Sequence, residues 1–296
     1  MRKLVTSLTL ALSLGVALPS WAQTTNEIPF EDALQDTENW REVAPEDLLR
    51  FRVMDGRGQE KGIILIELAE FTAPGHTERF TELARSGDLD GTVFHRVIDG
   101  FMAQGGDIES INPEKAENWP NIEGEFVFRR HPLKKDGSEP SMQKLGQDSS
   151  ATDGYIMGFP VQTQSEYLAS LTKDQAVESW IPHCKGVVST ARTNDPNSAS
   201  TQFFLMRDTT HDLDRRYTAW GRVVAGQDVV DSIKTGEPVK IPDMLISADL
   251  VADLPVDEQP RVLVQKTDGP AFAPVLEANA GANVCTLPAV PTIVSE

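Results

Sequence analysis

The stretch GTVFHRVIDGFMAQGGD, which begins at Gly91, combines strand-forming apolar residues with side chains that can do chemistry. Arg96 lies next to His95, and Gln104 follows later in the same stretch. A half-buried strand normally alternates apolar residues with solvated polar ones, so a long cationic side chain inside it needs either solvent or a function. A guanidinium stays charged and offers a rigid set of N–H donors, which suits it to stabilising electron density on a bound substrate.

A second stretch, TQFFLM (201–206), places amide and aromatic side chains in a similar pattern. Side chains alternate between the two faces of a strand. Gln202 and Phe204 therefore share one face, and Phe203 and Leu205 share the other. One face can belong to the core while the other belongs to a binding site.

The pattern FMAQGG (101–106) likewise puts Met102 and Gln104 on one face of a strand. Two such strands together can present an apolar pocket bordered by amides that bind a peptide backbone. The residues of this pocket would be Phe101, Met102, Gln104, Gln202 and Phe204. Each apolar member taken alone is more often a core residue, and a lone arginine is more often a surface residue, so only the combination argues for a site.

The physics of the peptide bond says what such a pocket can do. Rotation about an X-Pro bond meets a barrier of about 20 kcal/mol, although its two end states are nearly equal in energy. No nucleophile, metal or cofactor is required. It is enough to hold the proline ring, exclude water and place a donor where the twisted prolyl nitrogen gains a localised lone pair. Arg96 is the candidate donor.

The two stretches together, FHRVIDGFMAQGGD (94–107) and STQFFLM (200–206), resemble the paired signature of the cyclophilins, the peptidyl-prolyl cis-trans isomerases. The similarity extends through IILIEL, APGHTERF, GVVSTARTNDPNSAS and WGRVV. It covers the chain from about Phe51 to Leu250, apart from one long excursion. The resemblance implies an isomerase that needs no metal or cofactor.

The resemblance also implies a role for each matching residue, beginning with Arg96 as the catalytic arginine. The implied proline pocket is formed by Phe101, Met102, Phe204 and Leu213. The implied peptide groove is lined by His95, Gln104, Ala191 and Gln202. Tyr217 stands where many members have histidine, and this exchange keeps an aromatic wall with a polar tip.

Two further positions depart from the best-known eukaryotic members of the family. Asp212 stands where those members have tryptophan, which argues against cyclosporin-type inhibitor binding but not against isomerisation. Arg192 stands where they have asparagine, and we expect it to contribute backbone groups to the groove.

These observations predict a prolyl isomerase that assists the folding of exported proteins, acting as a monomer on proline-containing unfolded or partly folded polypeptides. The alternative is a cyclophilin-fold binding module or chaperone with weak or absent catalysis. A hydrolase that uses His95 and a serine has little support, because no nucleophile, base and orienting residue can be named. The other histidines considered, His76, His131 and His211, are interpreted as structural.

Many short segments with strand character and two good helical patterns predict a mainly β fold. The predicted strands are 48–54, 62–68, two in the stretch 92–106, 186–192, 201–206, 217–224 and 244–250. The predicted helices begin at Pro74, ending at Gly87, and at Gln227, ending at Lys234. We expect a closed antiparallel eight-stranded β-barrel capped by two α-helices, with a sandwich as the alternative.

The chain divides into segments of different composition. Residues 1–22 predict a signal peptide, 23–47 a flexible leader, 48–252 the isomerase domain, and 253–296 a tail rich in proline and alanine that is extended or disordered. An inserted loop or helical region spans about 108–185, within which Leu168, Leu171 and Val177 have helical spacing over residues 164–180.

Residues 1–22 place Arg2 and Lys3 before a short apolar run that ends in small residues, which predicts export to the periplasm or medium. No membrane span is expected after cleavage. Loss of those two cations takes the net charge from −18 to −20, and such an acidic chain disfavours nucleic acid as a partner. The two cysteines, Cys184 and Cys285, can form one disulfide in an oxidising compartment, although sequence does not decide whether they meet.

Overall fold

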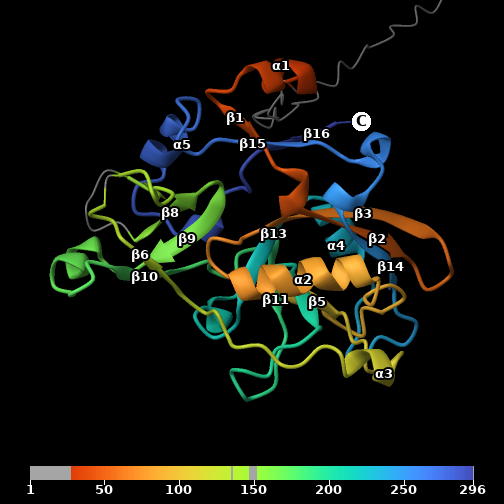
Figure 1. Cartoon of the computed structure of the whole chain (residues 1–296). Coiled ribbons are helices and arrows are strands. Elements are labelled where there is room, and N and C mark those ends of the chain that lie inside the picture. Colours follow the sequence, from red (N-terminus) through yellow and green to blue (C-terminus); the bar gives the residue numbers. More distant parts are fainter. Residues whose placement is uncertain (1–27, 135, 147–151, 296) are drawn as a thin grey trace, which may run out of the picture.

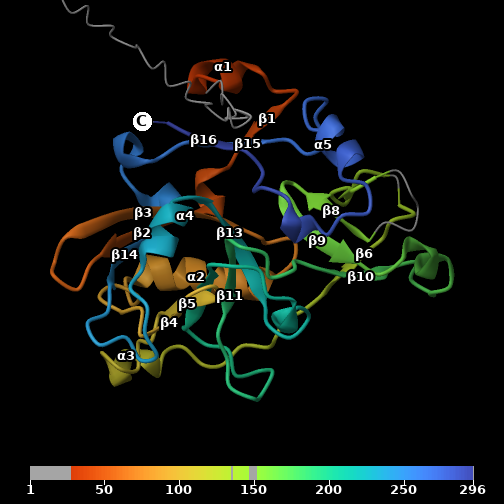
Figure 2. The same cartoon turned by 180° about the vertical axis from the view of Figure 1, so that it is seen from behind.

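The computed structural model describes residues 28–134, 136–146 and 152–295, so the predicted signal peptide lies outside the described residues. Within them, the regular structure is mainly β, in three antiparallel sheets of eight, five and three strands. Figures 1 and 2 show the eight-stranded sheet at the centre of the molecule, with the other two sheets beside and above it. No helix in the described ranges is long and apolar enough to cross a bilayer.

The eight-stranded sheet contains a counterpart of each of the eight strands predicted from the sequence. In spatial order they are β14 (Met244–Leu250), β2 (Leu48–Met54), β3 (Glu60–Leu68), β13 (Ala219–Ala225), β11 (Val187–Thr190), β12 (Phe203–Met206), β5 (Met102–Gly105) and β4 (Arg96–Ile98). Alternating apolar residues on these strands build the main core, in which Phe51, Phe203 and Trp220 are fully buried.

The prediction of a closed barrel is wrong in one respect, because the sheet curls but its two edge strands, β14 and β4, do not form a ladder with each other. The edges approach through an isolated bridge between Val93 and Met244. The physical reason lies just before β4, where Gly91 adopts a φ of 80° and turns the chain out of extended geometry. Residues 91–94 therefore make single hydrogen bonds to residues 243–245, and the strand predicted in this stretch is regular only over Arg96–Ile98.

The helix α2 (Pro74–Ser86) forms where the sequence predicts it. Proline begins the helix, and Gly87 ends it with a φ of 67°. Its buried face places the Phe80 ring on Trp220 of β13, with ring centroids 4.1 Å apart. The second predicted helix, α4 (Gln227–Ser232), is two residues shorter than expected. That one helix closes each end of a barrel stays a prediction.

The inserted region contains a five-stranded sheet that the sequence analysis did not predict. Its strands in spatial order are β6 (Phe128–Arg130), β10 (Val177–Trp180), β9 (Phe159–Thr163), β8 (Asp153–Ile156) and β7 (Gln143–Lys144). The helical spacing over 164–180 corresponds to a 3-10 turn at Glu166–Ser170 only, because Val177 begins β10. Leu168 and Leu171 are exposed, so their spacing does not mark a buried helical face.

Residues on both sides of the domain form the three-stranded sheet, made of β1 (Trp40–Glu42), β15 (Val262–Gln265) and β16 (Thr292–Val294). The expectation of a flexible leader therefore fails for residues 28–47, which also contain α1 (Phe30–Gln35). The cause is a long-range contact, because Trp40 is buried in a small cluster with Leu263 of the tail. The tail contributes β15 and β16 to this sheet and also contains a short helix and 3-10 turns.

The remaining helices are short, and most lie in loops. They are α3 (Pro113–Ala116), α5 (Ala273–Ala278) and the 3-10 turns Pro45–Asp47, Glu166–Ser170, His211–Leu213, Val251–Asp253, Val256–Glu258 and Val284–Thr286. A disulfide joins Cys184 to Cys285 with a Cα–Cα distance of 4.9 Å. It ties the last of these turns to the segment that enters β11.

Candidate active site

One row of cross-strand neighbours runs across four strands of the eight-stranded sheet. Arg96 on β4 is paired with Gln104 on β5, Gln104 with Phe204 on β12, and Phe204 with Ser189 on β11. Directly opposed residues of antiparallel strands present their side chains on the same face. The register therefore brings three of the predicted site residues together, although they come from segments about 100 residues apart.

The polar side chains of this row are held by hydrogen bonds. Arg96 Nε donates to Glu237 Oε1 at 2.6 Å, and Arg96 Nη1 donates to Gln104 Oε1 at 3.4 Å. Gln104 Nε2 in turn donates to Gln202 Oε1 at 2.9 Å. The two amides and the guanidinium thus form a continuous polar edge, and each keeps further hydrogen-bonding groups for a ligand.

A pocket of about 120 Å³ lies against this edge. Its lining consists of Arg96, Phe101, Met102, Gln104, Ala191, Arg192, Phe204, Leu213 and Tyr217, all of which belong to the predicted site. Met102 and Phe204 are 1% and 4% exposed, so the floor of the pocket is apolar and almost fully covered by neighbouring side chains. The pocket joins an apolar floor to a cationic rim.

Two further lining residues of the pocket, Leu213 and Tyr217, come from one turn. Leu213 ends a 3-10 turn, and its carbonyl oxygen accepts hydrogen bonds from Arg216 N and Tyr217 N at 3.1 Å each. The Tyr217 ring packs edge-to-face on Phe204, with centroids 5.8 Å apart. This turn therefore places the aromatic wall and the aliphatic wall side by side.

Arg192 contributes more than the backbone groups expected from the sequence. Its guanidinium lies 4.4 Å from the centre of the Tyr217 ring and donates to Arg216 O at 2.8 and 2.9 Å. A planar cation stacks well on an aromatic face, which explains why arginine is accommodated here. The side chain of Arg192 thus supports the wall of the pocket.

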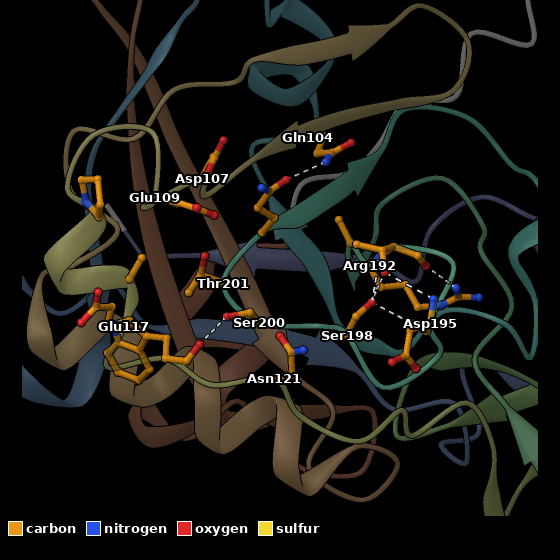
Figure 3. A pocket seen from close by; sticks show the side chains of 16 residues that line it. Gln104, Asp107, Glu109, Glu117, Asn121, Arg192, Asp195, Ser198, Ser200 and Thr201 are labelled. Carbon is orange, nitrogen blue, oxygen red and sulfur yellow. Dashed lines mark hydrogen bonds between the residues drawn. The ribbon is translucent and has the colours of Figure 1, made fainter.

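A larger cavity of about 780 Å³ adjoins the pocket and shares Gln104, Ala191 and Arg192 with it. Figure 3 shows Gln104 and Arg192 on one side of this cavity, with Ser200 and Thr201 on the other. Gln202 also lines it. Its carboxylates are Asp107, Glu109, Glu117 and Asp195. The pocket and cavity together form a groove that can hold a peptide on both sides of a seated side chain.

The family model described as cyclophilin type peptidyl-prolyl cis-trans isomerase/CLD matches residues 53–249, which is more than half of the chain. The chain belongs to the cyclophilin family. Its matched segment includes the row of cross-strand neighbours, the pocket and the inserted sheet.

Relatives of this cyclophilin agree with that assignment. A protein of Brucella suis named probable peptidyl-prolyl cis-trans isomerase is 31% identical over 214 residues, covering 71% of this chain and 85% of the relative. The peptidyl-prolyl cis-trans isomerase cyp18 of Streptomyces antibioticus is 33% identical over 181 residues, covering 58% of this chain and 78% of the relative. The crystal structure of cyclophilin AquaCyp293 from Hirschia baltica superposes with a TM-score of 0.83 at 43% identity, covering 90% of this chain and 98% of that one.

The role of His95, one of the predicted groove residues of this cyclophilin, stays a prediction. His95 lines neither the pocket nor the adjoining cavity, and its carbonyl oxygen accepts a hydrogen bond from Val239 N at 3.0 Å.

Sequence reasoning missed Glu237, which holds the arginine of this cyclophilin by an ion pair. The two residues are 141 positions apart, and a lone glutamate in a loop before a proline carries no signal of such a contact. Among the residues that the structure describes, no cluster of histidine, cysteine and carboxylate side chains could hold a metal ion.

Proposed function

We propose that this cyclophilin catalyses rotation about X-Pro peptide bonds and that Arg96 is its catalytic residue. The observation that carries the proposal is the position of the guanidinium at the rim of a small apolar pocket. The pocket, at about 120 Å³, is well below the ~300 Å³ of a cavity for a drug-sized ligand. It suits one compact ring, such as that of proline.

In this proposal, Met102, Phe204 and Leu213 hold the pyrrolidine ring while the preceding carbonyl turns. The amides of Gln104 and Gln202 bind the peptide backbone and keep the chain in register. As the amide twists, it loses its resonance and the prolyl nitrogen gains basicity. No covalent bond is made or broken, so the protein acts by stabilising the twisted state more than either planar one.

Arg96 has N–H groups available to donate a hydrogen bond to the prolyl nitrogen. A guanidinium has five N–H groups, of which the contacts to Glu237 and Gln104 occupy two among the described residues. We propose that a remaining Nη–H donates to the prolyl nitrogen in the twisted state. A positioned donor of this kind is worth about 3 kcal/mol in a partly desolvated site, or roughly a hundredfold in rate.

We propose further that the protein acts as a monomer on proteins that fold outside the cytoplasm. The N-terminal pattern of two cations followed by a short apolar run supports export. The disulfide between Cys184 and Cys285 also supports it, since disulfides persist in oxidising compartments. The acidic net charge of −18 supports polypeptides, and not nucleic acid, as partners.

The substrate proposal is tested by refolding a protein whose slow phase is limited by proline isomerisation. We expect the slow phase to accelerate in proportion to the concentration of this cyclophilin. A slow phase that does not change while the unfolded chain is bound would support the binding-module alternative instead.

The export proposal is tested by mass spectrometry of the mature protein from cells. We expect a mass that lacks residues 1–22. A protein that retains these residues and stays in the cytoplasmic fraction would contradict it.

A further inference from the structure

A buried chain of hydrogen bonds lies directly behind the prolyl pocket. Asp214 Oδ1 accepts from both the backbone N and Nδ1 of His183, at 2.7 and 3.0 Å. His183 Nε2 lies 2.9 Å from Ser189 Oγ. With the ring proton assigned to Nδ1, which faces the carboxylate, Nε2 accepts a hydrogen bond from the serine hydroxyl.

The second oxygen of the Asp214 carboxylate is also occupied. His211 Nδ1 donates to Asp214 Oδ2 at 2.8 Å, and His211 Nε2 accepts from Asn283 Nδ2 at 3.2 Å. Burial of Asp214 opposes its ionisation, but the hydrogen bonds from His183 and His211 outweigh burial and hold its pKa below the ordinary value of 3.8. The carboxylate is therefore a fixed negative charge that restrains two histidines at once.

The combination of serine, histidine and aspartate has the connectivity of a hydrolase triad, but its burial rules out that role. Ser189 and His183 are both 0% exposed, and neither lines the prolyl pocket or the adjoining cavity. A nucleophile must reach the reacting carbon of its substrate. The Ser189 hydroxyl cannot do so, because the residue is fully buried next to Phe204. The chain of hydrogen bonds can influence a bound substrate only through the residues that it holds.

These hydrogen-bonded residues contact the floor and one wall of the prolyl pocket. The His183 ring stacks on Phe204 with centroids 6.0 Å apart and an interplanar angle of 22°, and Ser189 is the cross-strand neighbour of Phe204. On the other side, Asp214 directly follows Leu213, whose side chain lines the pocket. One carboxylate is thus connected to the aromatic floor through His183 and to the aliphatic wall through its own backbone.

We propose that Asp214 is a positioning residue of this cyclophilin, which sets the distance between Phe204 and Leu213 by anchoring His183 and the 213–217 turn. The inference rests on the proposed isomerase function. Asp214 does not touch substrate, and its effect is exerted through the shape of the pocket. Because that shape is used to bind the proline ring, loss of the anchor weakens substrate binding more than it slows the bound step.

The test compares Asp214→Ala and Asp214→Asn by steady-state isomerase kinetics on a short proline peptide, with circular dichroism to confirm folding. We expect Asp214→Ala to raise KM about tenfold while kcat changes less. Asparagine keeps the acceptor for both donors of His183, so Asp214→Asn is expected to restore KM to within about twofold of the wild type. A folded alanine variant with wild-type KM and kcat would overturn the inference.

A matched control exists in the insertion, where Glu139 accepts from the backbone N and Nδ1 of His131 in the same manner. We expect Glu139→Ala to leave KM unchanged. An equal rise of KM in this variant would show a general loosening of the protein and would overturn the positioning role.

A second measurement does not depend on catalysis. In protein labelled with ¹³C-phenylalanine, we expect the Phe204 ring to flip slightly faster in Asp214→Asn than in the wild type, because asparagine keeps the acceptor for His183 but loses the acceptor for His211. We expect the ring to flip faster still in Ser189→Ala. Unchanged ring dynamics in both variants would overturn the inference even if Asp214→Ala did not fold. A wild-type protein without isomerase activity would refute the proposed function instead, and the ring dynamics would still decide this inference.

Discussion

Glu237 holds Arg96 at the rim of the prolyl pocket, with a distance of 2.6 Å between Glu237 Oε1 and Arg96 Nε. Arg96 lines the pocket, and this contact through Nε leaves N–H groups of the guanidinium available for a ligand. Both side chains are partly exposed, 37% for the arginine and 58% for the glutamate, so solvent screens the pair and limits its energy to that of a surface ion pair.

Removal of this carboxylate should therefore have a modest effect on catalysis. We expect Glu237→Ala to lower kcat/KM about threefold, since exposed ion pairs contribute at most about 1 kcal/mol. Glu237→Gln keeps an acceptor for Nε and should fall between the alanine variant and the wild type. Peptide isomerisation at low and high salt measures the effect, and a hundredfold loss would show that Glu237 takes part in the chemistry itself.

Phe204 and its neighbour Phe203 offer a matched pair of substitutions on one strand. Phe203 is 0% exposed and packs on Phe51 in the main core, with centroids 5.1 Å apart, so Phe203→Ala should cost about 3 to 5 kcal/mol of stability. Phe204→Ala opens the pocket and should lower kcat/KM at least about tenfold with a smaller loss of stability. Thermal unfolding and specific activity of the folded protein measure both. Unchanged specific activity in Phe204→Ala would contradict its place in the site.

The disulfide between Cys184 and Cys285 closes a loop with a sequence separation of 101 residues. Such a long loop loses considerable entropy on cross-linking, so we expect reduction to lower the free energy of unfolding by about 3 kcal/mol. Urea denaturation with and without reductant measures the difference. The double variant Cys184→Ser with Cys285→Ser should match the reduced protein and not respond to reductant; a further response would contradict the assignment.

Stability should also depend on pH through Glu125, which accepts hydrogen bonds from Gly75 N, His76 N and His76 Nδ1. Burial opposes ionisation of Glu125, but these hydrogen bonds outweigh it and hold its pKa below the ordinary value of 4.5. The folded state therefore binds this proton less readily than the unfolded chain. The resulting stabilisation is complete above pH 4.5 and is lost as the pH falls through the folded-state pKa.

Thermal unfolding between pH 3 and 6 checks this expectation. The wild type should lose stability below about pH 4.5, and Glu125→Gln should show a flatter profile in that range. Glu78→Gln, an exposed glutamate on the same helix as His76, serves as the control and should retain the wild-type profile. Identical profiles for wild type and Glu125→Gln would contradict the assignment.

The sequence predicts the fold best where local pattern and tertiary contact agree. Helix α2 has proline at its start, Gly87 at its end and Phe80 on its buried face, so every local signal points the same way. In the insertion, by contrast, Leu168 and Leu171 have the spacing of a buried helix face, although both are exposed. The sequence predicts a flexible leader around Trp40 because the residues near it do not indicate its contact with Leu263 of the tail.

In the candidate site, too, residues on strands could be placed from the sequence, and residues that reach the site through loops could not. Phe204 and Gln104 could be placed on matching faces because strand period alone decides which way a side chain points. The same period does not decide the direction of His95, which precedes the first residue of β4. Glu237 and Asp214 could not be found in this way, since each reaches its partner through a loop whose path no periodicity describes.

The account depends most on the guanidinium of Arg96, and a proline-peptide isomerisation assay tests it most directly. We expect Arg96→Ala to lower kcat/KM about a hundredfold with unchanged thermal stability, and Arg96→Lys to recover only part of the loss because an ammonium lacks the planar array of donors. Arg52→Ala, which removes a surface ion pair with Glu60, should retain wild-type activity. Wild-type kcat/KM in a folded Arg96→Ala variant would contradict the mechanism.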